Sequence, residues 1–115
     1  MLKRPKIVIL GAGMSGIACA LQLHKNFNVK VFEKSRGVGG RLCAKTLANG
    51  LFHFGAQFCK AKSSSFEAFI KQNDAVNFQG SLFDCNEELV TDSTKYFVCK
   101  DGMHGLLKKY KHLLN

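Results

Sequence analysis

The chain has 115 residues, of which 46% are hydrophobic and 22% charged, a balance typical of a globular protein with room for one compact domain. Its apolar run at residues 7–10 is too short to cross a bilayer, and no signal-peptide cleavage site follows it, so we expect a cytoplasmic protein without a membrane partner. The formal net charge of +9 attracts phosphate-bearing partners of every kind and does not choose among them.

The cysteines and histidines give no sign of a metal site. Five cysteines, an odd number without a Cys-x-x-Cys pair, suit neither a disulfide framework nor a zinc site. The four histidines show no ligand spacing to a cysteine or carboxylate partner, so we expect reduced, mostly packed thiols and no metal.

The first elements expected in chain order are a strand, a helix and a second strand, all within residues 6–34. Residues 7–10 are an apolar run that ends in glycine, which predicts a strand buried on both faces of a parallel sheet. A helix is expected from Met14 to about Lys25, where apolar residues recur at helical spacing. From Val29 to Phe32 the residues alternate and are rich in β-branched types, which predicts a second parallel strand. The predicted fold class is therefore α/β, with a Rossmann-like βαβ core.

The rest of the chain is expected to be less regular. Residues 35–60 are interpreted as a loop, because glycines interrupt any long element there. Residues 61–115 predict a helix at 65–73, short strands and turns at 77–94, a strand at 95–99 and a closing helix. In that helix, over residues 106–115, lysines lie between apolar residues, and we read them as a solvated face rather than a nucleic-acid contact. No linker divides the chain, so we treat residues 1–115 as a single domain.

A glycine motif follows the first strand and opens the helix. The pattern G-x-G-x-x-G is matched by Gly11, Ala12, Gly13, Met14, Ser15 and Gly16. Gly11 permits a tight turn, Gly13 leaves no side chain between the backbone and a pyrophosphate, and Gly16 lets the helix approach the strand closely. A pyrophosphate would there meet free backbone N–H groups and the positive end of the helix dipole.

An acidic residue closes the second strand at the position that ribose recognition requires. Glu33 lies about 20 residues after Gly11, where a carboxylate accepts hydrogen bonds from the ribose hydroxyls of an adenosine and repels the extra phosphate of NADP. The combination favours dinucleotide binding. The alternative is a glycine-rich turn in some other βαβ unit.

Three further stretches carry a resemblance to a known family. They are "EKSRGVGGR" at 33–41, "FGAQFCKAKSSSFEAFIKQ" at 54–72 and "YFVCKDGMHGLLKKY" at 96–110. In these stretches the chain resembles the FAD-dependent amine oxidase superfamily and, within it, the bacterial renalase-like oxidoreductases. The resemblance covers nearly the whole chain.

The resemblance implies FAD as the cofactor and assigns its contacts. The glycine motif would hold the pyrophosphate, Glu33 the ribose, Lys34 and Arg41 would lie near the adenosine and phosphates, and the Gly-Ala-Gln segment would approach the ribityl chain and isoalloxazine. The implied cofactor-binding residues are Gly11, Ala12, Gly13, Met14, Ser15, Gly16, Glu33, Lys34, Gly39, Gly40, Arg41, Gly55, Ala56 and Gln57.

Two positions depart from the family's pattern. His53 stands where an acidic residue is usual, three positions before the alanine of Gly-Ala-Gln, and Asp101 stands where proline usually precedes Gly-Met. A histidine between two phenylalanines is more often a packed or surface residue than a catalytic one, so we assign His53 no catalytic role. No other side chain is assigned one.

Members of the family are much longer than this chain, so the predicted domain is incomplete. The resemblance implies the FAD-binding portion of an oxidoreductase that passes hydride from its substrate to the flavin and is reoxidised by dioxygen. Its implied substrates are isomeric dihydronicotinamide dinucleotides or amines. A partner chain could supply the missing substrate domain, and we do not expect this chain to complete a catalytic cycle alone. The alternative is a non-catalytic nucleotide-binding or interaction module.

Overall fold

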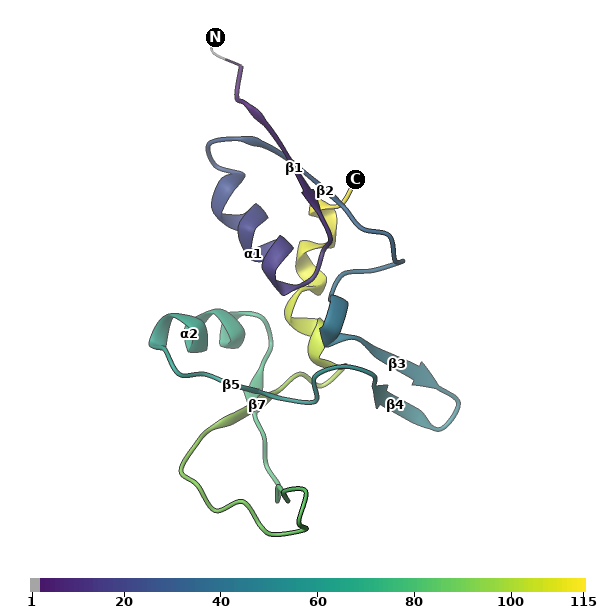
Figure 1. Cartoon of the computed structure of the whole chain (residues 1–115), viewed down its shortest axis with the longest axis vertical. Helices are drawn as coiled ribbons and strands as arrows, with labels where there is room; N and C mark the ends of the chain where they lie inside the picture. The colour runs from purple at the N-terminus through teal and green to yellow at the C-terminus, as the bar shows by residue number, and fades with distance from the viewer. Residues whose placement is uncertain (1–2) are drawn as a thin grey trace.

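A computed structural model describes residues 3–115 as an elongated molecule with principal extents of 60 × 36 × 21 Å (Figure 1). Strands β1 and β2 and helix α1 occupy one end of its long axis, and the loop between β6 and β7 occupies the other. Within this described part of the chain, no helix is both long and apolar enough to cross a membrane, and no group of side chains could hold a metal ion.

The predicted βαβ unit is confirmed. β1 spans Lys6–Leu10, α1 spans Met14–Leu23 and β2 spans Asn28–Phe32. The two strands pair in parallel, with Ile7 opposite Val29. The helix packs its buried residues Ile17 and Ala20 toward the sheet, as the helical spacing of the apolar residues predicts.

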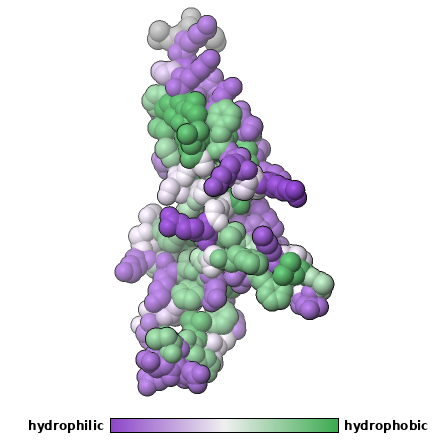
Figure 2. Space-filling view, turned by 45° about the vertical axis from the view of Figure 1, so that its right-hand side comes forward, coloured by the Kyte–Doolittle hydropathy of each residue, from purple (hydrophilic) through white to green (hydrophobic). Residues whose placement is uncertain are grey.

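The prediction that β1 is buried on both faces is wrong. Its residues alternate between exposed and half-buried, and Val8 is 58% and Leu10 83% exposed. The reason is the size of the sheet: β1 pairs with β2 alone, and α1 lies against one of its faces. Figure 2 shows apolar surface gathered in the upper part of the molecule, at the height where Figure 1 draws β1 and β2. An apolar run suited to a larger sheet is thus left half uncovered.

The outer edge of β2 is met by the end of the chain. Leu114 forms a parallel bridge with Val31, and the N–H of Asn115 donates to the carbonyl of Val31 at 2.9 Å. The last described residues therefore lie parallel to β2 along its outer edge. The side chain of Val31 is fully buried in the hydrophobic core.

The interpretation of residues 35–60 as loop is only partly correct. A short 3-10 helix, η1 (Gly40–Leu42), is followed by strands β3 (Ala44–Leu47) and β4 (Gly50–His53), which form an antiparallel hairpin. Ala48 and Asn49 form its turn, and Gly50, the first residue of β4, has a φ of 138°, in the region that favours glycine. An Asn-Gly pair is a strong hairpin signal, and the sequence prediction missed it.

The predicted helix and strand of the second half are confirmed. Helix α2 spans Ser64–Gln72, and the Ser63 hydroxyl accepts the N–H of Phe66 at 3.2 Å to cap it. The strands β5 (Cys59–Lys60), β6 (Val76–Asn77) and β7 (Tyr96–Val98) form a small antiparallel sheet in the order β5-β7-β6. β7 is its central strand, which buries Phe97 between its neighbours.

The closing helix is present in a different form. Residues 103–113 form two 3-10 helices, η2 (Met103–Leu106) and η3 (Lys108–Leu113), in place of one α-helix. The N–H of Leu107 donates to His104 and that of Tyr110 to Leu107, each at 3.0 Å. Leu107, Tyr110 and Leu113 recur every third residue and so share one face at the 3-10 period. Their lysine neighbours are exposed, in agreement with the predicted solvated face.

Candidate functional site: the glycine groove

The glycine motif adopts the geometry that its sequence requires. Gly11 ends β1 with a φ of 103°, and its N–H donates to the carbonyl of Phe32 at 2.7 Å. A Cβ at Gly16 would collide with the carbonyl oxygen of Gly11. Gly11 thus makes the turn and Gly16 permits the close approach of helix and strand, as predicted.

The second glycine segment, residues 35–41, lies directly against the first, residues 11–16. The N–H of Gly39 donates to the carbonyl of Ala12 at 2.9 Å, and Gly13 and Gly39 form a parallel bridge. A Cβ at Gly40 would stand 3.3 Å from the Cα of Gly13. Two segments more than 20 residues apart in sequence therefore meet backbone to backbone, and only residues with little or no side chain permit this approach.

An open groove runs across this junction, and we call it the glycine groove. It comprises two adjoining hollows of about 660 and 450 Å³. The first is lined by Leu10, Gly11, Gly13, Phe32, Glu33, Lys34 and Gly40. The second is lined by Leu10, Gly11, Gly13, Met14, Ser15, Gly16, Gly39, Gly40, Arg41 and Leu42. The shared residues make the two hollows continuous, with Glu33 toward one end and Arg41 toward the other.

Gly13 is central to this groove because it lines both hollows. Its φ of −77° is accessible to any residue, and an added Cβ would meet only the Cα of Gly40, at 3.9 Å. A larger side chain at this position would therefore take up the space of the groove without straining the backbone.

The carboxylate of Glu33 is held by backbone donors. Its Oε2 accepts the N–H of Ala12 at 2.6 Å, and its Oε1 accepts the N–H and the hydroxyl of Ser35 at 2.9 and 3.0 Å. The bond from Ala12 is the largest cause that lowers the pKa of Glu33 from its ordinary value near 4.5. Glu33 thus ties the end of β2 to the glycine loop as well as facing the groove.

The lowered pKa of Glu33 predicts a contribution to stability that depends on pH. The unfolded state keeps the ordinary pKa, so it binds more protons than the folded state once the pH falls past about 4.5. The contribution is therefore present above that pH and lost as the pH falls through the lower folded value. For this partly exposed group we expect the contribution to be about 1 kcal/mol.

Glu33→Gln should lower the unfolding free energy at pH 7 by this amount and make little difference at pH 3. Thermal denaturation followed by circular dichroism at both pH values checks this. An equal loss at pH 3 would contradict it.

The Gly-Ala-Gln segment is fastened to the far end of the groove. The N–H of Ala56 donates to the carbonyl of Arg41 at 2.9 Å, and a Cβ at Gly55 would collide with the same carbonyl oxygen. Gly55, Ala56 and Gln57 line neither hollow, and Gln57 is exposed. The structure thus brings this segment next to η1, and its contact with a flavin ring stays a prediction.

Sequence reasoning found the backbone of the groove and missed its apolar walls. Ala12 lines neither hollow and contributes through its backbone hydrogen bonds, while Gly39, Gly40 and Arg41 of the second glycine segment line the groove. Leu10, Phe32 and Leu42 line it without having been predicted. Leu10 and Phe32 could have been predicted as lining residues, because they are the last residues of β1 and β2. α/β sheets bind their ligands at this carboxyl edge of the strands.

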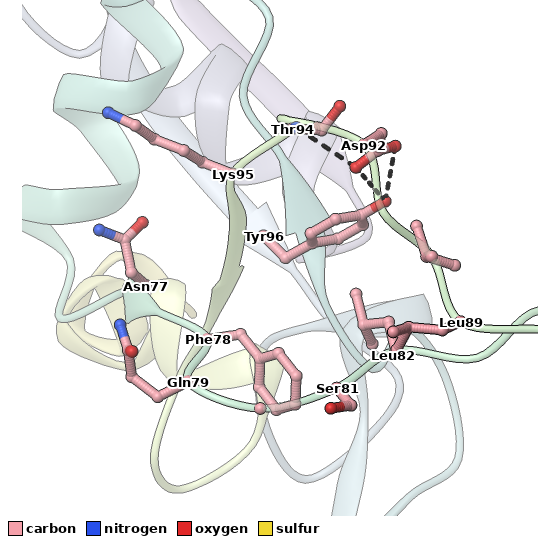
Figure 3. A pocket seen from close by; sticks show the side chains of 12 residues that line it. Asn77, Phe78, Gln79, Ser81, Leu82, Leu89, Asp92, Thr94, Lys95 and Tyr96 are labelled. Carbon is pink, nitrogen blue, oxygen red and sulfur yellow. Dashed lines mark hydrogen bonds between the residues drawn. The ribbon is translucent and has the colours of Figure 1, made fainter.

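A separate hollow of about 470 Å³ lies under the loop between β6 and β7 (Figure 3). The hydroxyl of Tyr96 donates to a carboxylate oxygen of Asp92 at 3.1 Å, and the N–H of Thr94 donates to the same side chain at 3.2 Å. These bonds fasten the loop to β7. The hollow shares no lining residue with the glycine groove, so it belongs to a different part of the molecule.

A family assignment follows from comparison with known proteins. The sequence profile of the family described as "NAD(P)-binding Rossmann-like domain" matches residues 9–73, which are more than half of the chain. The match begins within β1 and includes all of α1 and β2. The chain belongs to this family. The Rossmann-like fold predicted from the sequence is thereby confirmed, and the matched residues include both glycine segments.

Individual relatives extend this assignment. The chain is 48% identical over 46 residues to a zeta-carotene-forming phytoene desaturase of Myxococcus xanthus. The aligned region covers 39% of this chain and 9% of the relative. The chain superposes on a putrescine oxidase solved with putrescine bound, with a TM-score of 0.55 and 25% identity over 80% of this chain and 22% of that one. A reduced UDP-galactopyranose mutase shares the fold, with a TM-score of 0.58 and 21% identity over 70% of this chain and 18% of that one. The domain thus spans about a tenth of the desaturase and about a fifth of the solved chains.

Proposed function

We propose that this chain is the FAD-binding portion of a flavin oxidoreductase related to the amine oxidases, of the renalase-like kind. The observation that carries the proposal is the meeting of two glycine segments at Gly13 and Gly39, over a groove that extends to Glu33. A single glycine loop occurs in many nucleotide-binding proteins, whereas the two in contact are suited to an extended dinucleotide.

The residues of the groove fit FAD. Glu33 and Lys34 would receive the adenosine, the segment from Gly11 to Gly16 the pyrophosphate, and Arg41 would add a positive charge beside the phosphates. Gly13 leaves space for the pyrophosphate, because a side chain at this position would fill it. When bound there, FAD would supply an acceptor for hydride from a substrate and a route for the electrons to dioxygen, with hydrogen peroxide as the product.

FAD is supported as the cofactor by the set of relatives, which includes a carotenoid desaturase and an amine oxidase. Glu33 adds support, because a carboxylate at the ribose repels the additional phosphate of NADP. The proposed substrates of the complete enzyme are isomeric dihydronicotinamide dinucleotides or amines. The role of this chain in the reaction is to bind and orient the cofactor.

The exposed face of the β1–β2 sheet supports a further part of the proposal. Val8, Leu10 and Phe32 leave 58, 83 and 45% of their surface exposed. We propose that residues 1–115 act as one FAD-binding unit. Leu10 and Phe32 also line the glycine groove, so we propose that another polypeptide segment covers the part of this apolar face outside the groove, around Val8, and supplies the substrate domain.

Flavin uptake tests the proposed function. The purified protein is expected to be yellow, or to become so on addition of FAD, with the absorbance of a bound flavin retained after gel filtration. FAD contains the whole of ADP and would add contacts beyond it, so FAD should bind more tightly than ADP. A colourless protein that takes up no added FAD while it binds ADP or NAD would overturn the flavin assignment.

Binding of ADP or NAD without any uptake of FAD would favour a second candidate function, that of a non-catalytic nucleotide-binding or interaction module. The exposed apolar face of β1 and β2 and the net charge of +9 favour a docking role of this kind. Such a module would bind a nucleotide at the same groove and would show no absorbance change with FAD.

A further inference from the structure

The two departures from the family pattern lie around one side chain, His104. His53 ends β4, Asp101 precedes the first turn of η2, and both act electrostatically on His104. His104 belongs to η2 and packs behind the second glycine segment, where a Cβ added to Gly39 would stand 2.8 Å from its own Cβ. His104 and Asp101 therefore form a local polar pair outside the glycine groove, and His53 of the β3–β4 hairpin is near enough to influence it.

A cavity of about 280 Å³ opens beside this cluster, and we call it the His104 cavity. It lies between the β3–β4 hairpin and the turn that leads from β7 into η2 and η3. Its lining residues are Ala44, Thr46, Leu51, Lys100, Asp101, His104 and Lys108. Lys100 and Lys108 outnumber the single carboxylate of Asp101, so the lining is positive even with a neutral histidine. None of these residues lines the glycine groove.

His104 is unusual in its environment. Burial is the first cause that lowers its pKa below the ordinary 6.5, the charge of Lys108 and the proximity of His53 lower it further, and Asp101 opposes them. Its Nδ1 is buried and has no hydrogen-bond partner among residues 3–115. This nitrogen lies beside Gly102, where an added Cβ would stand 2.9 Å from it. Because His104 lines the cavity, an anion bound there would favour the protonated ring through its charge.

We propose that the His104 cavity binds the phosphate group of a small molecule, at a site separate from the dinucleotide. Two lysines from different segments converge on a space that holds a phosphate and part of the group attached to it. Thr46 adds a hydroxyl that can donate to a phosphate oxygen. The histidine can add a third positive charge once an anion stabilises its protonated form.

The pKa of His104 gives a direct readout of occupancy. The pKa is followed by nuclear magnetic resonance of its ring protons, in the whole chain carrying Gly13→Val, so that phosphate has no site in the glycine groove. Titration with sodium phosphate at constant ionic strength is expected to raise this pKa. By linkage, the affinity for a phosphate ion of fixed charge should increase as the pH falls from the pKa of His104 with phosphate bound to its pKa without phosphate. A pKa unchanged by saturating phosphate, compared with sodium chloride, would overturn the proposal.

Two substitutions of opposite sign separate binding from a structural role. Lys108→Gln is expected to weaken phosphate binding about tenfold through the loss of a charge-assisted hydrogen bond. Asp101→Asn is expected to strengthen binding, because it removes the one carboxylate of the cavity. Lys25→Gln, an exposed change outside every described cavity, is the control and should have no effect. Changes of the same sign in Lys108→Gln and Asp101→Asn would contradict the proposal.

The chemical class of the ligand is tested with one further comparison. Inorganic phosphate and a small phosphate monoester should both raise the pKa of His104, and Lys108→Gln should weaken both. A single-stranded oligonucleotide that alone perturbs His104, with a steep dependence on salt, would replace the small-molecule assignment with a nucleic-acid contact.

Discussion

Replacing Gly13 with valine will weaken FAD binding by more than about a hundredfold while leaving the fold intact. Gly13 lines both hollows of the glycine groove, so a branched side chain there would occupy the space of the pyrophosphate. The backbone tolerates the change, since the φ of Gly13 is −77° and only one atom lies within 4 Å of a Cβ. Titration with FAD followed by flavin fluorescence measures the loss, and thermal unfolding followed by circular dichroism measures the fold.

Gly37→Val is the matched control for this prediction. Gly37 lies in the second glycine segment, has no atom within 4 Å of an added Cβ and lines neither hollow. We expect it to bind FAD as the unsubstituted chain does. If Gly13→Val binds FAD equally well, the groove is not the cofactor site. If Gly13→Val unfolds, the fold itself requires the absence of a side chain at Gly13.

Replacing Gly16 with alanine will destabilise the protein by about 3 kcal/mol, a large share of the stability of a small domain. A Cβ at Gly16 collides with the carbonyl oxygen of Gly11, a backbone atom that cannot rotate away. The helix must then move away from β1, which opens the packing of Ile17 and Ala20 against the sheet. Chemical denaturation of the purified protein measures the loss as a lower midpoint at an unchanged slope.

The control for Gly16→Ala is Gly37→Ala, which places the same methyl group in open space at a φ outside the left-handed region. It should change the unfolding free energy by less than about 0.5 kcal/mol. The close approach of α1 to β1 would be refuted if Gly16→Ala were as stable as this control.

The glycine groove could be predicted from the sequence because its chemistry resides in the backbone. Gly11, Gly13 and Gly16 have tasks that depend on a missing side chain, and Glu33 has one that depends on the end of a strand. Each task follows from local spacing, and the structure places these residues at one groove. The helix at Ser64–Gln72 and the strand at Tyr96–Val98 could also be predicted, because the patterns of apolar residues that indicate them are local in the sequence.

The remaining features depend on contacts between distant segments. The sequence predicts β1 as a buried strand because its apolar run is continuous, whereas burial depends on how many strands and helices cover it. The closing segment has apolar residues compatible with both helix types, and the turn at Gly102, whose φ is 100°, precedes the 3-10 form. The packing of His104 against Gly39 had no local signal, because the two positions are separated by most of the chain.

The sequence alone determined the βαβ unit, the two glycine segments and the acidic residue at the end of β2, because spacing and residue type along the chain are sufficient for local backbone geometry. The tertiary structure alone decided that Gly13 and Gly39 meet, that Glu33 bonds to Ala12, and that His104 packs against Gly39. These are contacts between segments distant in sequence, and packing brings them together by burying Ile17, Phe97 and Met103 in one core.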